Sequence, residues 1–439
     1  MKFMKFGKAL LIGALSAGVV LGVTSCVQSY TVGFLYVTGT ATAQSTGNGI
    51  ISGFKIDHNT GKLTRINGLP ISSGGSNPVR ALLLTGSRFL YVLNRGVTAE
   101  GGSVCTASDP CAGSVAAFAV GGNGILTPQG SPYPTYGLNP FRMLVDGTGN
   151  YILVLDHDSP SSAACALALG ANVTSCGDIT VFKVDQTTGR LSVVVNAQVT
   201  SAIGSQLPYF PVPANPIDFV MPAGSLLTLS GTPTTGDSVF PYTFSGASGQ
   251  LTLSQNTSQA LGIRQATAIV NASSVIYVLD NEAPSPKPTG ATSQILPFTV
   301  GAGGALQAET GGNVADDPSL ANPIYLLAES KGKFLYVLNQ GNNVQGTNAQ
   351  SGIAGYNIFT SPSYQLTPTS PSTFGTGAGP QCIVEDPSDQ FIYTANYNDS
   401  TVTGRLVDPN AGVLNQMRVA SSFALTGPPT WCVVDGRTS

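Results

Sequence analysis

Short apolar and aromatic runs alternate with polar turns along the chain, and one run recurs almost unchanged. The stretch RFLYVLNRG at 88–96 returns as KFLYVLNQG at 333–341 and, more loosely, as QFIYTANYN at 390–398. There are seven related runs, about 50 to 75 residues apart, a spacing typical of propellers and other repeat proteins. The seven runs lie at 34–37, 89–94, 151–156, 226–230, 275–280, 334–339 and 391–396.

Each aromatic run belongs to a unit with a fixed internal order. An apolar run precedes it, opened by Pro as in NPVRALLL from Asn77, except in RQATAIV from Arg264. A loop follows, and then an alternating strand, a turn and a short strand, as in GFKIDHNTGKLTRI from Gly53. Asn, Asp and Gly between alternating apolar runs favour hairpins, because Gly adopts positive φ without strain. The pattern predicts four antiparallel strands per unit, named A to D in chain order.

Seven such units, with no helical periodicity after the N-terminal segment, predict an all-β fold. We expect a seven-bladed β-propeller of four-stranded antiparallel blades. The first unit begins at strand B, residues 33–38, and the chain ends with a spare A strand, residues 429–435. That C-terminal strand is expected to complete the first blade and to close the ring without an open sheet edge.

The N-terminal residues have the pattern of an export signal. Three lysines precede an apolar run at 9–23 and then small residues, with no stop-transfer pattern after them. The ending VTSC resembles the lipobox of bacterial lipoproteins, which implies cleavage before Cys26 and its lipidation; an ordinary signal peptide is the alternative. We therefore expect a signal peptide at 1–25, a lipidated N-terminus and linker at 26–32, and the propeller at 33–439.

This reading places the protein in the bacterial cell envelope, attached to a membrane only through the N-terminal lipid. The residue after Cys26 is Val27 rather than Asp, which by the same resemblance favours the outer membrane.

Composition narrows the range of partners. Charged residues make up 9% of the chain, against roughly 25% in typical soluble domains. The hydrophilic surface must therefore consist mainly of Ser, Thr, Asn, Gln and Gly. Removing the three signal lysines from the 19 basic residues leaves 16 against 22 acidic ones, a net charge of -6. No basic face for nucleic acid is expected, and nothing in the sequence indicates an oligomer, so we expect a monomer.

Six cysteines remain after Cys26 in an oxidising compartment, and six cysteines allow 15 pairings. Local pairing favours Cys105–Cys111 and Cys165–Cys176, which leaves Cys382–Cys432. The last two lie on A strands at positions of opposite parity, as is required to face each other across one gap between blades.

Loop lengths indicate where a site would lie. The A–B and C–D turns are short, whereas four B–C loops are long, at about 95–112, 157–177, 281–293 and 340–350. Long loops around one mouth of a rigid scaffold favour a binding site there. Strands B end on this rim, so their terminal residues Asn94, Asp156 and Asn339 are candidate ligand-binding residues. The alternative is that these side chains cap their own turns.

Strands A begin on the same rim, and one position of each is polar or aromatic in most blades. Two residues after each Pro, or by alignment in the unit without Pro, stand Arg80, Arg142, Asp218, Thr267, Tyr325, Cys382 and Trp431. We predict that Arg80, Tyr325 and Trp431 bind an anionic, ring-shaped ligand.

Gly-x-Ser-x-Gly, His-Glu-x-x-His and phosphate-loop motifs are absent from the sequence. The two histidines are predicted on opposite rims, so neither a metal nor a cofactor is expected.

The repeats resemble a known family. The YVLN-like strand ends at 91–94, 336–339 and 393–396, and the D-x-x-T-G-x-L hairpins at 57–63 and 185–191, are similar to the lactonase-type seven-bladed propellers with YVTN repeats. The resemblance covers residues 30–439 and implies the propeller fold and a 6-phosphogluconolactonase-like activity.

Lactone hydrolysis would need a group that polarises the carbonyl and a base that activates water. Arg142 or Arg80 could fill the first role, and Asp218, Asp156 or His157 the second.

One family feature is missing. Family members with that activity carry Pro-His at the start of an A strand. None of the residues that follow Pro in these strands is His; they are Val79, Phe141, Ile217, Ile324, Gln381 and Thr430.

Two functions are therefore open. The first is an exported hydrolase of a sugar lactone or related ester at the long-loop mouth. The second is a non-catalytic surface propeller that binds a saccharide, peptide or protein partner there.

Overall fold

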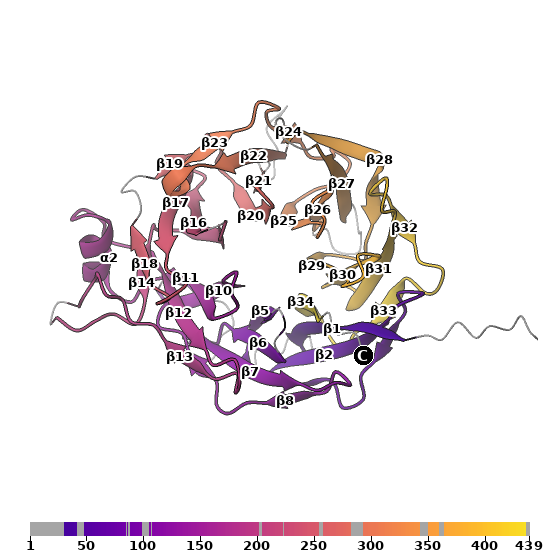
Figure 1. Ribbon diagram of the computed structural model, residues 1–439, viewed down its shortest axis with the longest axis horizontal. Helices are drawn as coiled ribbons and strands as arrows, with labels where there is room; N and C mark the ends of the chain where they lie inside the picture. The colour runs from indigo at the N-terminus through magenta and orange to yellow at the C-terminus, as the bar shows by residue number, and fades with distance from the viewer. Residues whose placement is uncertain are drawn as a thin grey trace, which may run out of the picture.

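The computed structural model is a ring of seven antiparallel sheets, which confirms the predicted propeller (Figure 1). It describes residues 30–41, 48–84, 86, 88–98, 105–106, 108–201, 204–222, 224–253, 258–281, 293–342, 350–359 and 364–435. The predicted signal peptide, Cys26 and most of the linker lie outside the described residues. None of the helices in the described ranges has the length and apolar character needed to cross a membrane.

Each blade runs from the centre of the ring to its outer edge. The innermost strands are β34 (Pro429–Asp435), β5 (Pro78–Leu83), β10 (Leu138–Val145), β15 (Pro216–Val220), β20 (Ala266–Ala272), β25 (Pro323–Ala328) and β29 (Pro380–Glu385). The second strands are β1 (Thr31–Thr40), β6 (Phe89–Asn94), β11 (Tyr151–Asp158), β16 (Ser225–Thr232), β21 (Val275–Asp280), β26 (Phe334–Asn339) and β30 (Phe391–Asn396). The third strands are β2 (Asn48–Asp57), β7 (Ser114–Val120), β12 (Gly177–Val184), β17 (Gly236–Phe244), β22 (Gln294–Val300), β27 (Gly352–Ile358) and β31 (Thr401–Val407).

The outermost strand differs from the prediction, because six blades carry two short pieces in its place. These pairs are β3 (Leu63–Arg65) and β4 (Ile71–Ser76), β8 (Leu126–Pro128) and β9 (Tyr133–Pro134), β13 (Leu191–Val193) and β14 (Phe210–Val212), β18 (Leu251–Leu253) and β19 (Gln259–Ala260), β23 (Leu306–Ala308) and β24 (Val314–Ala315), and β32 (Leu414–Gln416) and β33 (Ser422–Ala424). Only β28 (Leu366–Gly375) is continuous among the described outer strands. Between the pieces lie turn residues such as Gly68 and Gly130, both at positive φ.

Besides its strands, this all-β fold includes two short helical segments among the described residues. Helix α2 (Ser162–Leu169) stands in the long loop after β11, and a short 3₁₀ turn, η1 (Ala302–Gly304), precedes β23. Ser161 begins α2 by accepting a hydrogen bond from the Ala164 N–H at 3.2 Å. Eight residues give too few turns for a helical period to be visible in the sequence.

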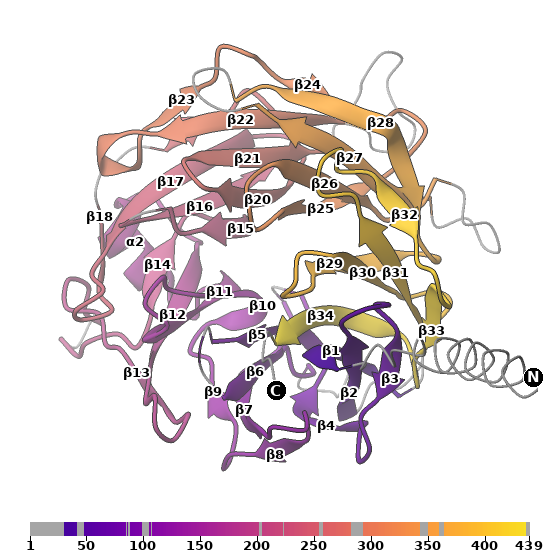
Figure 2. The same ribbon diagram turned by 45° about the vertical axis from the view of Figure 1, so that its right-hand side comes forward.

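The ring closes as predicted. The C-terminal strand β34 pairs antiparallel with β1, the first described strand, and Trp431 lies opposite Thr38 (Figure 2). The disulfide Cys382–Cys432 joins β29 of the last blade to β34 at this seam. The predicted bridges Cys105–Cys111 and Cys165–Cys176 are also formed.

The two recurrent motifs meet in neighbouring blades. The Tyr91 hydroxyl donates a hydrogen bond of 2.9 Å to the carbonyl of Gly189, in the hairpin of the next blade. Tyr393 donates to Gly61 at 2.8 Å across the seam. A Cβ on Gly61 would lie 2.5 Å from the Phe391 ring, so this position requires glycine. A Phe-x-Tyr strand in one blade and a Thr-Gly hairpin in the next therefore form a contact that joins the two blades, which explains why both motifs recur.

Four of the seven innermost strands start with an Asn-Pro pair in which Asn has a positive φ. Asn139 has a φ of +57°, and after it Pro140 lies opposite Asp156 while Arg142 lies opposite Leu155. Phe141 between them has no partner in the ladder and forms a bulge, which re-aims the side chains at the strand start. The same register shift occurs in all seven innermost strands.

This register corrects one sequence alignment. In β20, Ala266 lies opposite Asp280 and Ala268 lies opposite Leu279. Thr267 is therefore the bulge residue of its blade, and Ala268 occupies the position that Arg142 holds in the third blade.

Candidate functional site

A cavity of about 460 Å³ opens where the innermost strands begin and the second strands end, the rim predicted from the loop lengths. Its described lining comes from four blades and the ring-closing strand. The lining residues are Val79, Arg80, Arg95, Phe141, Arg142, Gln340, Gly379, Gln381, Tyr397, Asn398 and Thr430. The volume lies in the range of small-molecule sites.

Arg80, Trp431 and Tyr325, predicted as ligand-binding residues, form one stack. The Arg80 guanidinium carbon lies 3.8 Å from the centroid of the Trp431 ring, and its Nη1 donates to the carbonyl of Val79 at 2.9 Å. Tyr325 meets the same indole edge-on, with 5.0 Å between ring centroids. Trp431 is 8% exposed. The indole is thus a support that holds Arg80 at the cavity wall.

Arg142 and Asp218, predicted as catalytic residues, form an ion pair. Arg142 Nε lies 3.3 Å from Asp218 Oδ1. The Asp218 carboxylate also accepts the backbone N–H groups of Phe219 at 3.0 Å and of Ile269 at 3.2 Å. These partners engage both oxygens of the Asp218 carboxylate, and its charge lies beside the Arg142 guanidinium.

The cavity is electropositive. Arg80, Arg95 and Arg142 line it, and none of the other described lining residues is Asp, Glu or His. Burial and the nearby Arg142 charge lower the pKa of Arg80 to about 9, so Arg80 remains a cation at neutral pH. Burial also lowers the pKa of Arg95. In the described part of the chain, only Arg142 of the three has a carboxylate within 4.0 Å.

Arg95 has unused hydrogen-bonding capacity. Its Nε is buried and finds no hydrogen-bond partner among the described residues. Buried polar groups are normally satisfied, and a guanidinium is matched by carboxylate or phosphate oxygens. An anion bound in the cavity would supply such oxygens.

His157, the third predicted catalytic residue, lies beside the cavity. Its ring meets Phe141 of the cavity wall at 6.1 Å between centroids, with the planes inclined by 61°. Its Nδ1 lies 3.1 Å from Asp158 Oδ2, and its side chain is 41% exposed. The structure thus brings together Arg80, Arg142, Asp218, Tyr325 and Trp431, with His157 at the edge of the group.

The strand-terminal residues Asn94, Asp156 and Asn339 are placed differently from the prediction. All three are 0–1% exposed and none is among the lining residues. Asn94 accepts a hydrogen bond from Ser73 Oγ at 2.7 Å and donates to the Ser73 carbonyl at 3.0 Å. Asp156 accepts from Thr180 Oγ1 at 3.2 Å. This burial does not support ligand binding by the three, and these bonds lead to neighbouring strands rather than to their own turns.

The residues that follow two of these positions line the cavity instead. Arg95 comes after Asn94, and Gln340 after Asn339, while Tyr397 holds the same position after Asn396. Alternate side chains of a strand point to opposite sides. Applying that alternation one residue beyond each aromatic run would have identified these residues from the sequence.

Asp156 instead forms a buried pair with Asp178, its cross-strand neighbour on β12. Both carboxyl groups are 0% exposed. Burial raises the pKa of both residues well above the usual range, and the facing Asp156 charge raises the pKa of Asp178 further. Two facing carboxyl groups out of contact with water resist ionising together. Within the described residues, no group of three or more His, Cys, Asp or Glu side chains is arranged to hold a metal ion.

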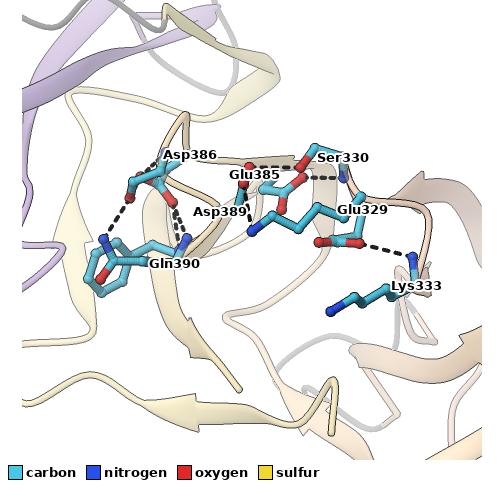
Figure 3. A network of polar contacts seen from close by, with 10 residues as sticks. Glu329, Ser330, Lys333, Glu385, Asp386, Asp389 and Gln390 are labelled. Carbon is cyan, nitrogen blue, oxygen red and sulfur yellow. Dashed lines mark hydrogen bonds and ion pairs between the residues drawn. The ribbon is translucent and has the colours of Figure 1, made fainter. Parts of the chain in front are cut away.

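A second polar network joins the sixth and seventh blades at their short A–B turns (Figure 3). Glu385 accepts the Ser330 N–H at 2.8 Å, and Lys331 pairs with Asp389 at 2.9 Å. Burial, with the charges of Glu329, Asp389 and Asp386, raises the pKa of Glu385 to about 7. These turns are at the opposite ends of the strands from the cavity, so the network bears on stability rather than on the site.

Comparison with known proteins agrees with the fold and the repeats. Residues 289–429 match the family model described as Lactonase, 7-bladed beta-propeller, which confirms the predicted resemblance to that family. A search of the curated proteins found no match.

Solved structures share the fold at low sequence identity. A periplasmic gluconolactonase of Pseudomonas aeruginosa is 17% identical with a TM-score of 0.65, over 93% of this chain and 99% of that one. A candidate 6-phosphogluconolactonase of Bacteroides fragilis is 14% identical with a TM-score of 0.63, over 92% and 98%. The chain thus shares its seven-bladed propeller fold with these structures.

Proposed function

We propose that the mouth cavity binds a sugar acid or its lactone, and that lactone hydrolysis is the activity of the site. The observation that carries the proposal is the group of three arginines facing one cavity that no described Asp, Glu or His lines. The fold of the two solved structures, which are named as lactonases of sugar acids, supports the choice of ligand class.

The lining offers each kind of contact that such a ligand needs. Arg80 and Arg95 would pair with a carboxylate or phosphate group, because a guanidinium matches both geometrically. The side-chain amides of Gln340 and Gln381 would hydrogen-bond to hydroxyl groups. Tyr397 and Phe141 would contact the apolar face of the sugar ring.

Hydrolysis would use the residues at one side of the cavity. Arg142 would polarise the lactone carbonyl while His157 accepts a proton from water. The water oxygen bonds to the carbonyl carbon, the ring carbon–oxygen bond breaks, and the released oxygen takes up the proton. The product is the open hydroxy acid. In this scheme Asp218 holds Arg142 in place and does not itself act as the base.

Binding without turnover is the second candidate. None of the residues that follow Pro in the innermost strands is His, which favours this candidate. The described cavity wall also contains no titratable side chain other than arginine and tyrosine. The partner would then be a saccharide, or a peptide or protein docked on the same rim.

The N-terminal sequence and the three disulfides support a further part of the proposal. We propose export to the cell envelope and a lipid anchor on Cys26. Mass spectrometry of the purified N-terminus tests this directly, since an unmodified Cys26 in the mature protein would rule out the anchor.

A panel of sugar lactones tests the activity. Hydrolysis by the wild type is compared with Arg142→Ala and with Arg190→Ala, a matched change at an exposed hairpin arginine. We expect turnover that Arg142→Ala lowers roughly 100-fold or more, the effect of removing a group that stabilises an oxyanion. If the wild type turns over no lactone faster than buffer does, the hydrolase proposal is wrong and binding without turnover remains.

A further inference from the structure

His157 and Asp158 form a pair at the edge of the cavity. His157 Nδ1 lies 3.1 Å from Asp158 Oδ2, while the ring meets Phe141 of the cavity wall. When a carboxylate accepts the hydrogen bond of one imidazole nitrogen, the proton stays on that nitrogen and the other nitrogen keeps its lone pair. A hydrogen bond from Nδ1 at this contact would leave Nε2 as the nitrogen available to act as a base.

Asp158 is itself held by Asn139, which lies on β10 of the same blade. Asn139 Nδ2 donates to Asp158 Oδ2 at 2.6 Å. The same amide donates to the carbonyl of Thr106 at 3.1 Å, and Asn139 Oδ1 accepts the Cys111 N–H at 2.8 Å. Thr106 and Cys111 belong to the second blade's loop, where Cys111 is bridged to Cys105. Hydrogen bonds therefore lead from the stapled loop through Asn139 to Asp158, which in turn contacts His157.

Asp158 also acts on the cavity electrostatically. Its negative charge raises the pKa of Arg95 and so opposes the lowering caused by burial. Asp158 is thus within reach of both His157 and Arg95, which flank the same cavity. One carboxylate orients the candidate base and favours the charged form of the candidate anion-binding residue.

We propose that Asp158 is a positioning residue, which fixes the Nδ1–H tautomer of His157 and aims Nε2 at the cavity, and that the stapled loop holds Asp158 through Asn139. The inference rests on the proposed hydrolysis for its catalytic meaning. The same logic operates in hydrolases whose base is oriented by a carboxylate. It also gives the Cys105–Cys111 bridge a role in organising the site.

The tautomer can be measured without any substrate. The chain has only two histidines, so ¹⁵N spectra of the full-length protein with labelled histidine contain two imidazoles, and His58→Gln identifies the signals of His157. At a pH where the ring is neutral, we expect Nδ1–H in the wild type and a shift towards Nε2–H in Asp158→Asn. Asp109→Asn, the same chemical change in the stapled loop, is the control and should leave the tautomer unchanged.

Kinetics give the second readout. Asp158→Asn should lower kcat for the best lactone by roughly 100-fold while changing KM little, as expected for loss of general-base catalysis. Asn139→Gly tolerates the positive φ and removes the amide, and it should lower kcat in the same direction.

Different results would overturn the proposed hydrolysis and the proposed positioning role of Asp158. A wild type without lactone turnover overturns the proposed activity, while the tautomer measurement still decides the positioning role. An unchanged His157 tautomer in Asp158→Asn overturns the positioning role whatever the activity.

Discussion

Arg80 lies with its guanidinium carbon 3.8 Å from the centroid of the Trp431 ring, and this contact joins the second blade to the strand that closes the ring. Arg80 has no carboxylate within 4.0 Å in the described chain, so its charge is held by an aromatic face and by a backbone carbonyl. The cavity therefore keeps an unneutralised cation at its wall, and ring closure is what completes the site.

Removal of the aromatic support should weaken ligand binding. Trp431→Leu removes a cation–π contact of about 0.5 to 2 kcal/mol and leaves Arg80 free to move. We expect the Kd for a sugar acid to rise roughly 3- to 30-fold, measured by isothermal titration calorimetry. Phe359→Leu, at a side chain on the exposed surface, is the control. Equal affinities for Trp431→Leu and the wild type would show that the stack does not support the site.

The hydrogen bond between Tyr393 and Gly61 should contribute to closure of the ring. Tyr393→Phe leaves the Gly61 carbonyl buried without its partner, which costs about 1 to 3 kcal/mol. Urea unfolding should show that loss, and Tyr91→Phe should show a similar one because the same bond recurs there. Tyr136→Phe, at a partly exposed tyrosine, should change stability little. A loss confined to Tyr393 would mean that the repeated motif does not act alike in each blade.

The raised pKa of Glu385 predicts a pH dependence of stability. In the folded protein its pKa is about 7, above the usual glutamate value, so the folded state binds the proton more tightly than the unfolded chain does. Stability from this group is complete below the usual glutamate pKa and is lost as pH rises through about 7. Thermal unfolding should therefore show that the stability of Glu385→Gln, relative to that of the wild type, increases between pH 5 and pH 8. Glu309→Gln is the control, and an equal gain there would contradict the assignment.

The buried pair of Asp156 and Asp178 also predicts a loss of stability as pH rises. Because the pKa values of Asp156 and Asp178 are raised, the unfolded chain releases its protons at a lower pH than the folded chain does. Wild-type stability should fall as pH rises above the usual carboxyl range. Asp178→Asn removes one carboxyl group of the pair and should flatten that dependence. A variant that follows the wild-type pH profile would show that the pair does not cause this dependence.

The repeated runs were sufficient to predict the fold because each repeat carries its own local chemistry. Phe-x-Tyr strands, Asn-Pro starts and Thr-Gly hairpins are short motifs, and the structure uses each of them in contacts between or within blades. The predicted disulfide Cys382–Cys432 followed from exclusion and strand parity, and both considerations hold in three dimensions.

The site was harder to predict because it depends on where the strands bulge and on which residues follow them. Position counting placed Thr267 with Arg142, whereas the bulge puts Ala268 there. The end of the aromatic run favoured Asn94, but the cavity is lined by Arg95, the next residue. Helix α2 was missed for a different reason, since eight residues within a loop carry no clear period.

Binding of D-gluconate to the purified full-length protein, compared with neutral D-glucose, tests the central claim most directly. The two ligands are similar in size and hydroxyl content, and they differ in the carboxylate that Arg80 and Arg95 would pair with. We predict calorimetric binding of gluconate at least tenfold tighter than that of glucose, with the preference lost in an Arg80→Ala, Arg95→Ala double variant. Equal affinities, or a preference that survives the double variant, would contradict the account.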